Sequence, residues 1–121
     1  MEKMGLSERI RAYLTKLARH RRTITYLDLA KELEVQPPNT IHQVTNTLEV
    51  LMQEDCTNGA PFLAALVVSK VHNGLPAPGF FSFARSLGRF RGSDTGPETH
   101  ACHAGELQRA WNYWGSLDNR F

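Results

Sequence analysis

Hydrophobic positions recur at helical spacing through the first half of the chain. They predict an amphipathic helix over residues 7–20, with its apolar side at Ile10, Tyr13, Leu14, Leu17 and Ala18. The β-branched stretch 23–25 predicts a short edge strand. Thr25, with Asp28 three residues later, resembles a capping box and predicts a second helix over about 26–34. Pro37-Pro38 ends that helix. Asn39 is then a suitable N-cap for a third helix over about 40–55, whose apolar set is Ile41, Val44, Leu48, Leu51 and Met52.

The pattern changes after Asn58-Gly59. Residues 62–69 form a continuous apolar run, which predicts a buried strand. Asn73-Gly74 is a hairpin turn signal, and residues 76–79 form an extended piece that predicts a second strand. Residues 80–87 suit a short helix that stops at Gly88, and 88–97 is expected to be a loop. Pro97 opens a last helix, with an apolar stripe at Leu107, Ala110, Trp111, Trp114 and Leu117.

The order of these elements predicts an α+β fold. Three helices with a tight turn before the third, followed by a β-hairpin, is the order of a winged helix-turn-helix. We therefore expect a winged helix-turn-helix-like three-helix core with a small β-hairpin and an additional C-terminal helix. One domain is expected over 1–121, with the core in 7–75 and a helical C-terminal extension in 76–121. An unrelated small α+β domain is the alternative.

The overall composition says little about function, whereas the distribution of charge along the chain is more informative. The chain has 121 residues, 41% of them hydrophobic, and a net charge of +2, as in an ordinary soluble globular protein. It has no run long enough for a membrane span, no apolar signal segment at its start, and two cysteines without CxxC spacing, so we expect a cytoplasmic protein. Residues 1–22 are strongly basic, 37–75 contain Lys70 as the one lysine or arginine, and 80–91 contain three arginines and no acid.

The third helix carries polar residues suited to reading DNA. In a helix-turn-helix this helix enters the major groove, where amides pair with adenine and threonine meets the thymine methyl group. It contains no lysine or arginine, so neighbouring segments would hold the phosphates. An ordinary solvated surface is the alternative. The predicted nucleic-acid-binding residues are Thr40, Gln43, Asn46 and Thr47 for bases, and Arg19, Arg21, Arg22, Lys70, Arg85 and Arg89 for phosphates.

Part of the chain resembles a known family. Thr25-Tyr26-Leu27-Asp28-Leu29-Ala30 is similar to the Thr-Tyr-x-x-Leu-Ala segment of the alkyltransferase and alkyltransferase-like winged-helix domain. Residues 61–68 lie where that family carries Pro-Cys-His-Arg-Val-Val, and Asn73-Gly74 with Pro78-Gly79-Phe80 is similar to the glycines that follow. The resemblance implies a winged-helix fold over roughly 10–88. The same segment, with Gly59-x-Pro61 and Pro78-Gly79-Phe80-Phe81, is also similar to small bacterial winged-helix proteins without assigned activity. The nucleophile, its histidine and the arginine would fall at Phe62, Leu63 and Ala64, which excludes alkyl transfer.

No other chemistry is strongly indicated. The densest cluster of residues that could bind a metal is His100, Cys102 and His103. Their spacing is not that of a known structural zinc site, so we expect them to pack at the start of the last helix, with zinc binding as the alternative. Phosphate-binding glycine loops and nucleophile elbows are absent from the sequence. We therefore expect no metal, no cofactor and no enzymatic activity.

Two functions remain as hypotheses. The first is a non-catalytic winged-helix regulator of transcription that binds double-stranded DNA. The alternative is a small protein-binding inhibitor, such as a phage or mobile-element anti-defence protein of the anti-CRISPR type, which would bind a protein or ribonucleoprotein complex. The aromatic C-terminal helix, with Trp111 and Trp114, packs on its own domain or anchors a partner, including a homodimer. DNA binding requires that the basic residues share a face with the third helix, whereas basic residues that face away from this helix favour a protein partner.

Overall fold

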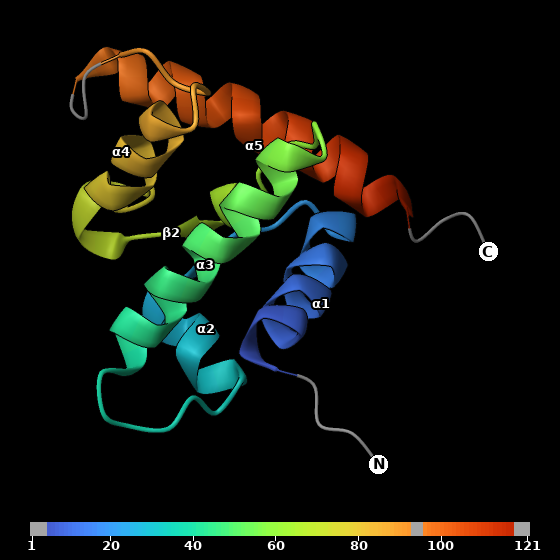
Figure 1. Cartoon of the computed structure of the whole chain (residues 1–121), viewed down its shortest axis with the longest axis vertical. Helices are drawn as coiled ribbons and strands as arrows, with labels where there is room; N and C mark the ends of the chain where they lie inside the picture. The colour runs from blue at the N-terminus through green and yellow to red at the C-terminus, as the bar shows by residue number, and fades with distance from the viewer. Residues whose placement is uncertain (1–4, 93–95, 118–121) are drawn as a thin grey trace.

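The computed structural model describes residues 5–92 and 96–117, in which five helices surround a small parallel sheet (Figure 1). Most helices predicted from the sequence are present within a few residues of their expected bounds. The parts of the predicted 88–97 loop and of the C-terminal extension that fall on 93–95 and 118–121 lie outside the described residues. The elements are α1 (Leu6–Arg19), β1 (Ile24–Thr25), α2 (Tyr26–Glu32), α3 (Thr40–Thr57), η1 (Leu63–Leu66), β2 (Val67–Val68), η2 (Lys70–His72), α4 (Pro78–Ser86) and α5 (Pro97–Leu117).

The starts of α2 and α3 are fixed in different ways. The Thr25 hydroxyl accepts a hydrogen bond from the backbone N–H of Asp28 at 3.1 Å, which confirms the predicted cap. Asn39 precedes α3 as predicted, but its backbone is left-handed, with φ at 60°, and its side chain makes no capping hydrogen bond. Instead, the Gln43 amide donates to the carbonyls of Gln36 and Pro38, both at 2.8 Å. Gln43 thus holds the turn before α3 in place.

The predicted β-hairpin is wrong. The apolar run is a 3₁₀ turn, η1, followed by the two-residue strand β2, which pairs in parallel with β1 and not with the chain that follows. Asn73 and Gly74 do turn the chain with positive φ angles of 57° and 81°. However, Pro78 occupies the first turn of α4, so the expected strand over 76–79 is absent: residues 76–77 are extended chain without strand pairing and 78–79 begin a helix. A continuous apolar run indicates burial but does not fix the backbone period.

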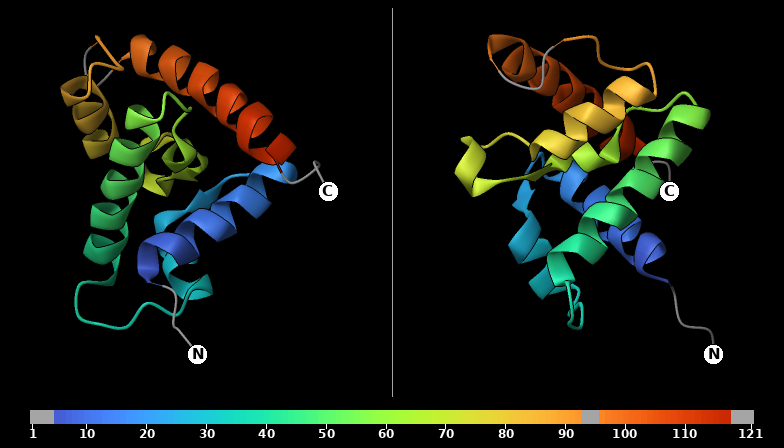
Figure 2. Two further views of the ribbon diagram at one scale, coloured as in Figure 1. Left: turned by 45° about the vertical axis from the view of Figure 1, so that its right-hand side comes forward. Right: turned by 60° about the vertical axis from the view of Figure 1, so that its left-hand side comes forward.

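The 62–68 segment lies at the centre of the core, and every residue in it is buried. α5 lies across the end of α1 and extends towards α4 (Figure 2). A Cβ on Gly115 would lie 2.9 Å from the carbonyl oxygen of Ala18, so the α1 and α5 backbones approach closely at this point. None of the helices in the described ranges is long and apolar enough to cross a membrane.

Two tryptophans attach α5 to the rest of the chain. The indole N–H of Trp114 donates to the Pro61 carbonyl at 2.9 Å, and that of Trp111 donates to the Arg22 carbonyl at 3.2 Å. Both rings are half-buried, as expected for aromatic residues that pack on their own domain. Dimerisation through this helix stays a prediction.

Candidate binding groove along α3

Two of the predicted phosphate-binding arginines stabilise the protein itself. Arg89 lies over the Phe62 ring, 4.3 Å from its centroid, and donates to the Glu106 carboxylate at 3.2 Å. Arg85 donates to the Gly92 carbonyl at 3.0 Å. Both guanidinium groups therefore hold the region between α4 and α5, and the structure does not bring them to the start of α3.

Arg19, Arg21 and Arg22 are exposed at the end of α1, beside α5. Arg21 donates to the Asn112 side chain at 2.6 Å and lies 5.9 Å from the centre of the Trp111 ring. We call residues 19–22 the basic corner. The end of α1 and the first turns of α3 lie at different ends of the molecule in Figures 1 and 2, so the basic corner does not share a face with the predicted base-reading residues.

The four predicted base-reading residues differ in what their side chains do. Gln43 is bonded to the preceding turn, and the Thr47 hydroxyl donates to the Gln43 carbonyl at 2.7 Å. Thr40 is half-buried, whereas Asn46 is exposed. Of the predicted cations, Lys70 is the one that lies beside α3, where it lines the same hollow as Ile41. Asn46 and Lys70 are thus the two members of the predicted set that remain available on this side.

Three hollows lie along α3, and the third opens on a different side of the helix from the first two, because Asn46, Val50 and Gln53 point away from Ile41, Thr45 and Leu48. The first lies among α2, η2 and the start of α3, the second between the middle of α3 and α4, and the third beside Phe83. Thr45 and Ala77 line both the first and the second hollow, and Glu49 lines both the second and the third. Their cavity volumes are about 330, 50 and 380 Å³. Because neighbouring hollows share walls, they form one continuous surface, which we call the α3 groove.

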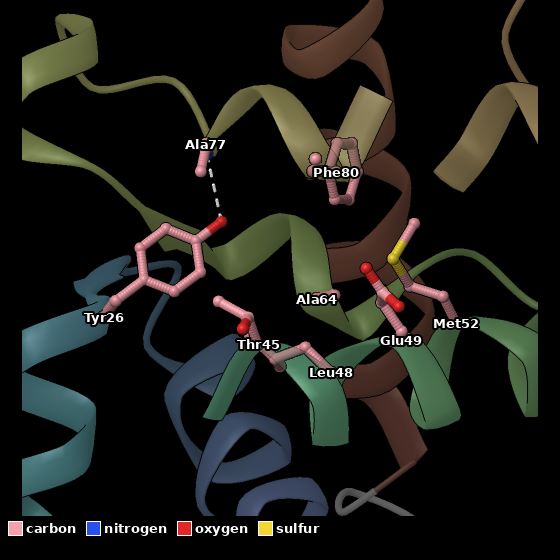
Figure 3. A pocket seen from close by; sticks show the side chains of 9 residues that line it. Tyr26, Thr45, Leu48, Glu49, Met52, Ala64, Ala77 and Phe80 are labelled. Carbon is pink, nitrogen blue, oxygen red and sulfur yellow. Dashed lines mark hydrogen bonds between the residues drawn. The ribbon is translucent and has the colours of Figure 1, made fainter. Parts of the chain in front are cut away.

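Figure 3 shows the second hollow, where Tyr26 of α2 and Phe80 of α4 face Leu48 of α3. The Tyr26 hydroxyl accepts a hydrogen bond from the backbone N–H of Ala77 at 3.0 Å. Burial raises the pKa of Tyr26, and the Ala77 N–H opposes this rise. The neutral phenol therefore forms part of the wall that the first two hollows share. The second hollow admits groups of about the size of water or a methyl group.

Exposed hydrophobic side chains gather in the α3 groove. Five large hydrophobic residues are exposed in the described part of the chain. Three of them line the first hollow together: Leu27 at 53%, Ile41 at 38% and Val71 at 84% exposure. Val50, at 49% exposure, lines the third hollow on another side of α3. The fifth is Tyr113 on α5. The sequence-based assignment of Ile41 to the core is wrong, because this first-turn side chain faces the first hollow. Clustered exposed hydrophobic residues mark an interaction surface, whereas isolated ones do not.

The charged residues of the groove are mostly acidic. Asp28, Glu49 and Glu54 line it, against Lys70 at one end. Glu54 is paired with Arg11 at 2.9 Å. Glu49 is half-buried and has no hydrogen bond or ion pair with any residue that the structure describes. A surface with this balance repels phosphates, since DNA backbone contacts need cations.

The segment where the alkyltransferase-like family carries its reactive cysteine is closed. Phe62 and Leu63 are buried, and their backbone N–H groups donate to two buried carboxylates, Glu106 at 2.6 Å and Asp55 at 3.0 Å. Burial raises the pKa of Asp55, and the Leu63 N–H and the Arg11 guanidinium oppose this rise. Both acids therefore hold the backbone of the turn and are not open to a substrate.

The histidines and cysteine at the start of α5 do not form a common site. His103 is buried, and its Nε2 lies 2.9 Å from the Ala65 carbonyl, to which it donates as the Nε2–H tautomer. Burial lowers the pKa of His103 and raises the pKa of the half-buried Cys102 thiol, while His100 is exposed. Within residues 5–92 and 96–117, no three His, Cys, Asp or Glu side chains are grouped so that they could hold a metal ion.

Comparison of the chain with family models, with curated proteins and with solved structures found no match.

The hydrophobic pattern of the sequence did not predict most of the groove. Leu27, Val50 and Val71 are apolar residues that lie off the predicted apolar stripes, and that departure was the available signal. Nothing in the sequence indicated that Glu49 belongs to the groove, because a single acidic residue on a helix usually lies on a solvated face. Its position became informative once the structure placed it between two hollows.

Proposed function

We propose that this chain is a non-catalytic binding module that engages another protein through the α3 groove. The observation that carries the proposal is the gathering of Leu27, Ile41 and Val71 in the first hollow of this groove. Interfaces between proteins combine such an apolar centre with a polar rim, and they concentrate binding energy in a few side chains. A small inhibitor from a phage or mobile element, acting on a protein or ribonucleoprotein complex, is one role that such a module would fill.

The same surface is poorly suited to duplex DNA. We infer that α1–α3 are a helix-turn-helix variant in which η2 takes the place of a wing, in line with the alkyltransferase-like resemblance. Docking of this motif would bring phosphates towards α2 and η2. Lys70 is the one basic side chain lining the groove there, next to Asp28. A fold of this kind supports many functions, so the lining of the site decides between them.

Site-specific photo-cross-linking tests the proposal. A photoreactive amino acid is placed at Val50 or Val71 in the groove, or at the exposed Lys16 on α1 as a matched control. The expected result is a defined adduct with one protein of the host cell from both groove positions and none from position 16. Excess unlabelled wild-type chain should remove the adduct, and excess Val50→Asp chain should not. Equal labelling from all three positions would contradict the proposal.

Nucleic-acid binding at the basic corner is a second candidate function. The specific observation in its favour is that Arg19, Arg21 and Arg22 are exposed together beside the Trp111 ring, a combination of cations and an aromatic face that suits single strands. Gel shifts with duplex and single-stranded DNA at two salt concentrations test it. Corner binding should fall steeply with salt and be lost in an Arg19→Gln/Arg22→Gln variant.

The same gel shifts test the original DNA hypothesis. Asn46→Ala and Lys70→Gln should leave any DNA binding unchanged if the α3 groove is a protein site. Salt-dependent duplex binding that these two variants abolish would instead establish α3 as a DNA-reading helix and overturn the proposed function.

A further inference from the structure

Two asparagine–glycine pairs lie on the surface of the protein, and they differ in how the chain around them is held. Asn58-Gly59 follows α3, and Asn73-Gly74 follows η2. All four residues are exposed. We propose that Asn73-Gly74 is a self-modifying site, at which the asparagine deamidates spontaneously in the folded protein while Asn58 is protected. The inference goes beyond the proposed function and does not depend on it, because the reaction needs no partner.

The reaction uses the asparagine, the glycine and water alone. The backbone nitrogen of Gly74 attacks Cγ of Asn73, the Cγ–Nδ2 bond breaks, and the amide group leaves as ammonia with the proton of the Gly74 N–H. Water then opens the cyclic succinimide at one of its two carbonyl groups. Opening at Cγ gives aspartate, and opening at the backbone carbonyl gives isoaspartate, in which the main chain runs through Cγ. Glycine favours the attack because it has no Cβ to hinder the approach of its nitrogen.

The chain at Asn58 is held in a helix cap. The Gly59 N–H donates to the Cys56 carbonyl at 3.1 Å, and the Ala60 N–H donates to the Asp55 carbonyl at 2.8 Å. Together with the positive φ of 67° at Gly59, these two bonds form a Schellman motif at the end of α3. Ala60 and Asp55 are both buried. Freeing the Gly59 nitrogen therefore requires unwinding the end of a helix that is anchored in the core.

The chain at Asn73 is held less firmly. η2 has three residues, none of which is buried, and Val71 within it is 84% exposed. The Gly74 N–H donates to the Ser69 carbonyl at 3.3 Å, which is beyond the usual range for such a bond. Asn73 has a positive φ of 57°, a conformation that is uncommon outside glycine. Exposed turns with few buried contacts open at a low cost in free energy, so the Gly74 nitrogen is released more often than that of Gly59.

Conversion at Asn73 would change the walls of two hollows. Asn73 lines a hollow of about 300 Å³ together with His72 and His100, so the new carboxylate would form in a hollow that two imidazoles line. Isoaspartate also lengthens the main chain within the turn 69–75. Val71 belongs to this turn and lines the first hollow of the α3 groove. The modification therefore places a negative charge and a longer main chain at the edge of that hollow.

Peptide mapping of the full chain measures the reaction. The folded protein is incubated for several weeks at body temperature and mildly alkaline pH, with circular dichroism to check that it stays folded, and is then digested with trypsin. Asn73 is the one asparagine of the peptide 71–85, and Asn58 lies in the peptide 32–70. Mass spectrometry with fragmentation locates each conversion of amide to acid, and chromatography separates aspartate from isoaspartate. The same chain in guanidinium chloride is the reference, because unfolding exposes both pairs equally.

In the unfolded chain, Asn58 and Asn73 should convert at similar rates. In the folded chain, Asn73 should convert about tenfold faster than Asn58, because the two bonds of the helix cap must break before Gly59 can react. Asn73→Gln should abolish conversion in the peptide 71–85 and leave that of Asn58 unchanged, because glutamine forms the corresponding ring far more slowly. An unconverted Asn73 in the folded chain, or an Asn58 that converts as fast as Asn73 there, would overturn the inference.

Discussion

Replacing Gly115 with alanine should separate α1 from α5. A Cβ at this position would lie 2.9 Å from the Ala18 carbonyl oxygen and 3.2 Å from both the Ala18 carbonyl carbon and the Arg19 Cα. All three atoms belong to the α1 backbone, so no side-chain rotation relieves the contact. α1 and α5 would have to move apart by several tenths of an ångström along their whole interface.

Gly105 provides a control within the same helix. A Cβ there would meet the guanidinium of Arg109 at 3.3 Å, the flexible end of a side chain that is 61% exposed. Gly→Ala in a helix interior stabilises by about 0.8–1.0 kcal/mol through propensity, and this gain applies to both positions. Overpacking against fixed atoms costs about 1–3 kcal/mol and applies to Gly115 alone. Gly115→Ala should therefore be less stable than Gly105→Ala by about 1–3 kcal/mol.

Urea unfolding followed by circular dichroism measures this difference. Gly105→Ala should have a higher midpoint than the wild type, and Gly115→Ala a lower or equal one, with unchanged m-values. In thermal unfolding the two variants should differ by about 4 °C for each kcal/mol. If both substitutions stabilise the protein equally, α5 does not pack on α1 as closely as the structure has it.

Three further predictions concern single contacts. Thr25→Ala should lower the free energy of unfolding by about 1 kcal/mol in urea titrations, because the Asp28 N–H loses its cap, and Thr25→Ser should restore most of it. Glu106→Gln should cost about 1.5–3 kcal/mol, and combining it with Arg89→Met should cost less than the sum, as a double-mutant cycle would show. The pKa of His103 is lowered below 6.5 in the folded protein, so as the pH falls the unfolded chain binds a proton at this residue before the folded protein does. The free energy of unfolding should therefore decrease as the pH falls below 6.5. His103→Gln keeps a donor for Ala65 and should flatten the loss of stability between pH 7 and 5; an unchanged slope would show that His103 is not its source.

The helices could be predicted because local rules decide them. Thr25 as a cap and Pro97 as a helix start depend on a few neighbouring residues, and they set the starts of α2 and α5. The predicted end of the second helix at Pro37-Pro38 is wrong, because α2 ends at Glu32, where Glu34 turns the chain with a positive φ of 52°. The pairing of β2 with β1 could not be predicted, because it joins residues 24–25 to residues 67–68 across the whole of α2 and α3. The lining of the groove likewise depends on how α4 lies beside α3, which no local pattern specifies.

Three arginines show why the net charge of a chain does not indicate a phosphate-binding surface. Arg9 donates to the Leu33 carbonyl, Arg85 to the Gly92 carbonyl and Arg89 to the Ala60 carbonyl. Each of these carbonyls lies outside the helices and needs a donor, and the guanidinium group offers five N–H groups on a long side chain.

Arg9 and Arg89 are half-buried and add to the net charge while their guanidinium groups bind backbone carbonyls, whereas Arg22 at the basic corner is exposed. It follows that the two groups should respond differently to substitution. Replacing Arg9 or Arg89 should lower stability and leave polyanion binding nearly unchanged. Replacing Arg22 should do the reverse, so paired stability and binding measurements on the same variants distinguish an arginine that holds the fold from one that meets a partner.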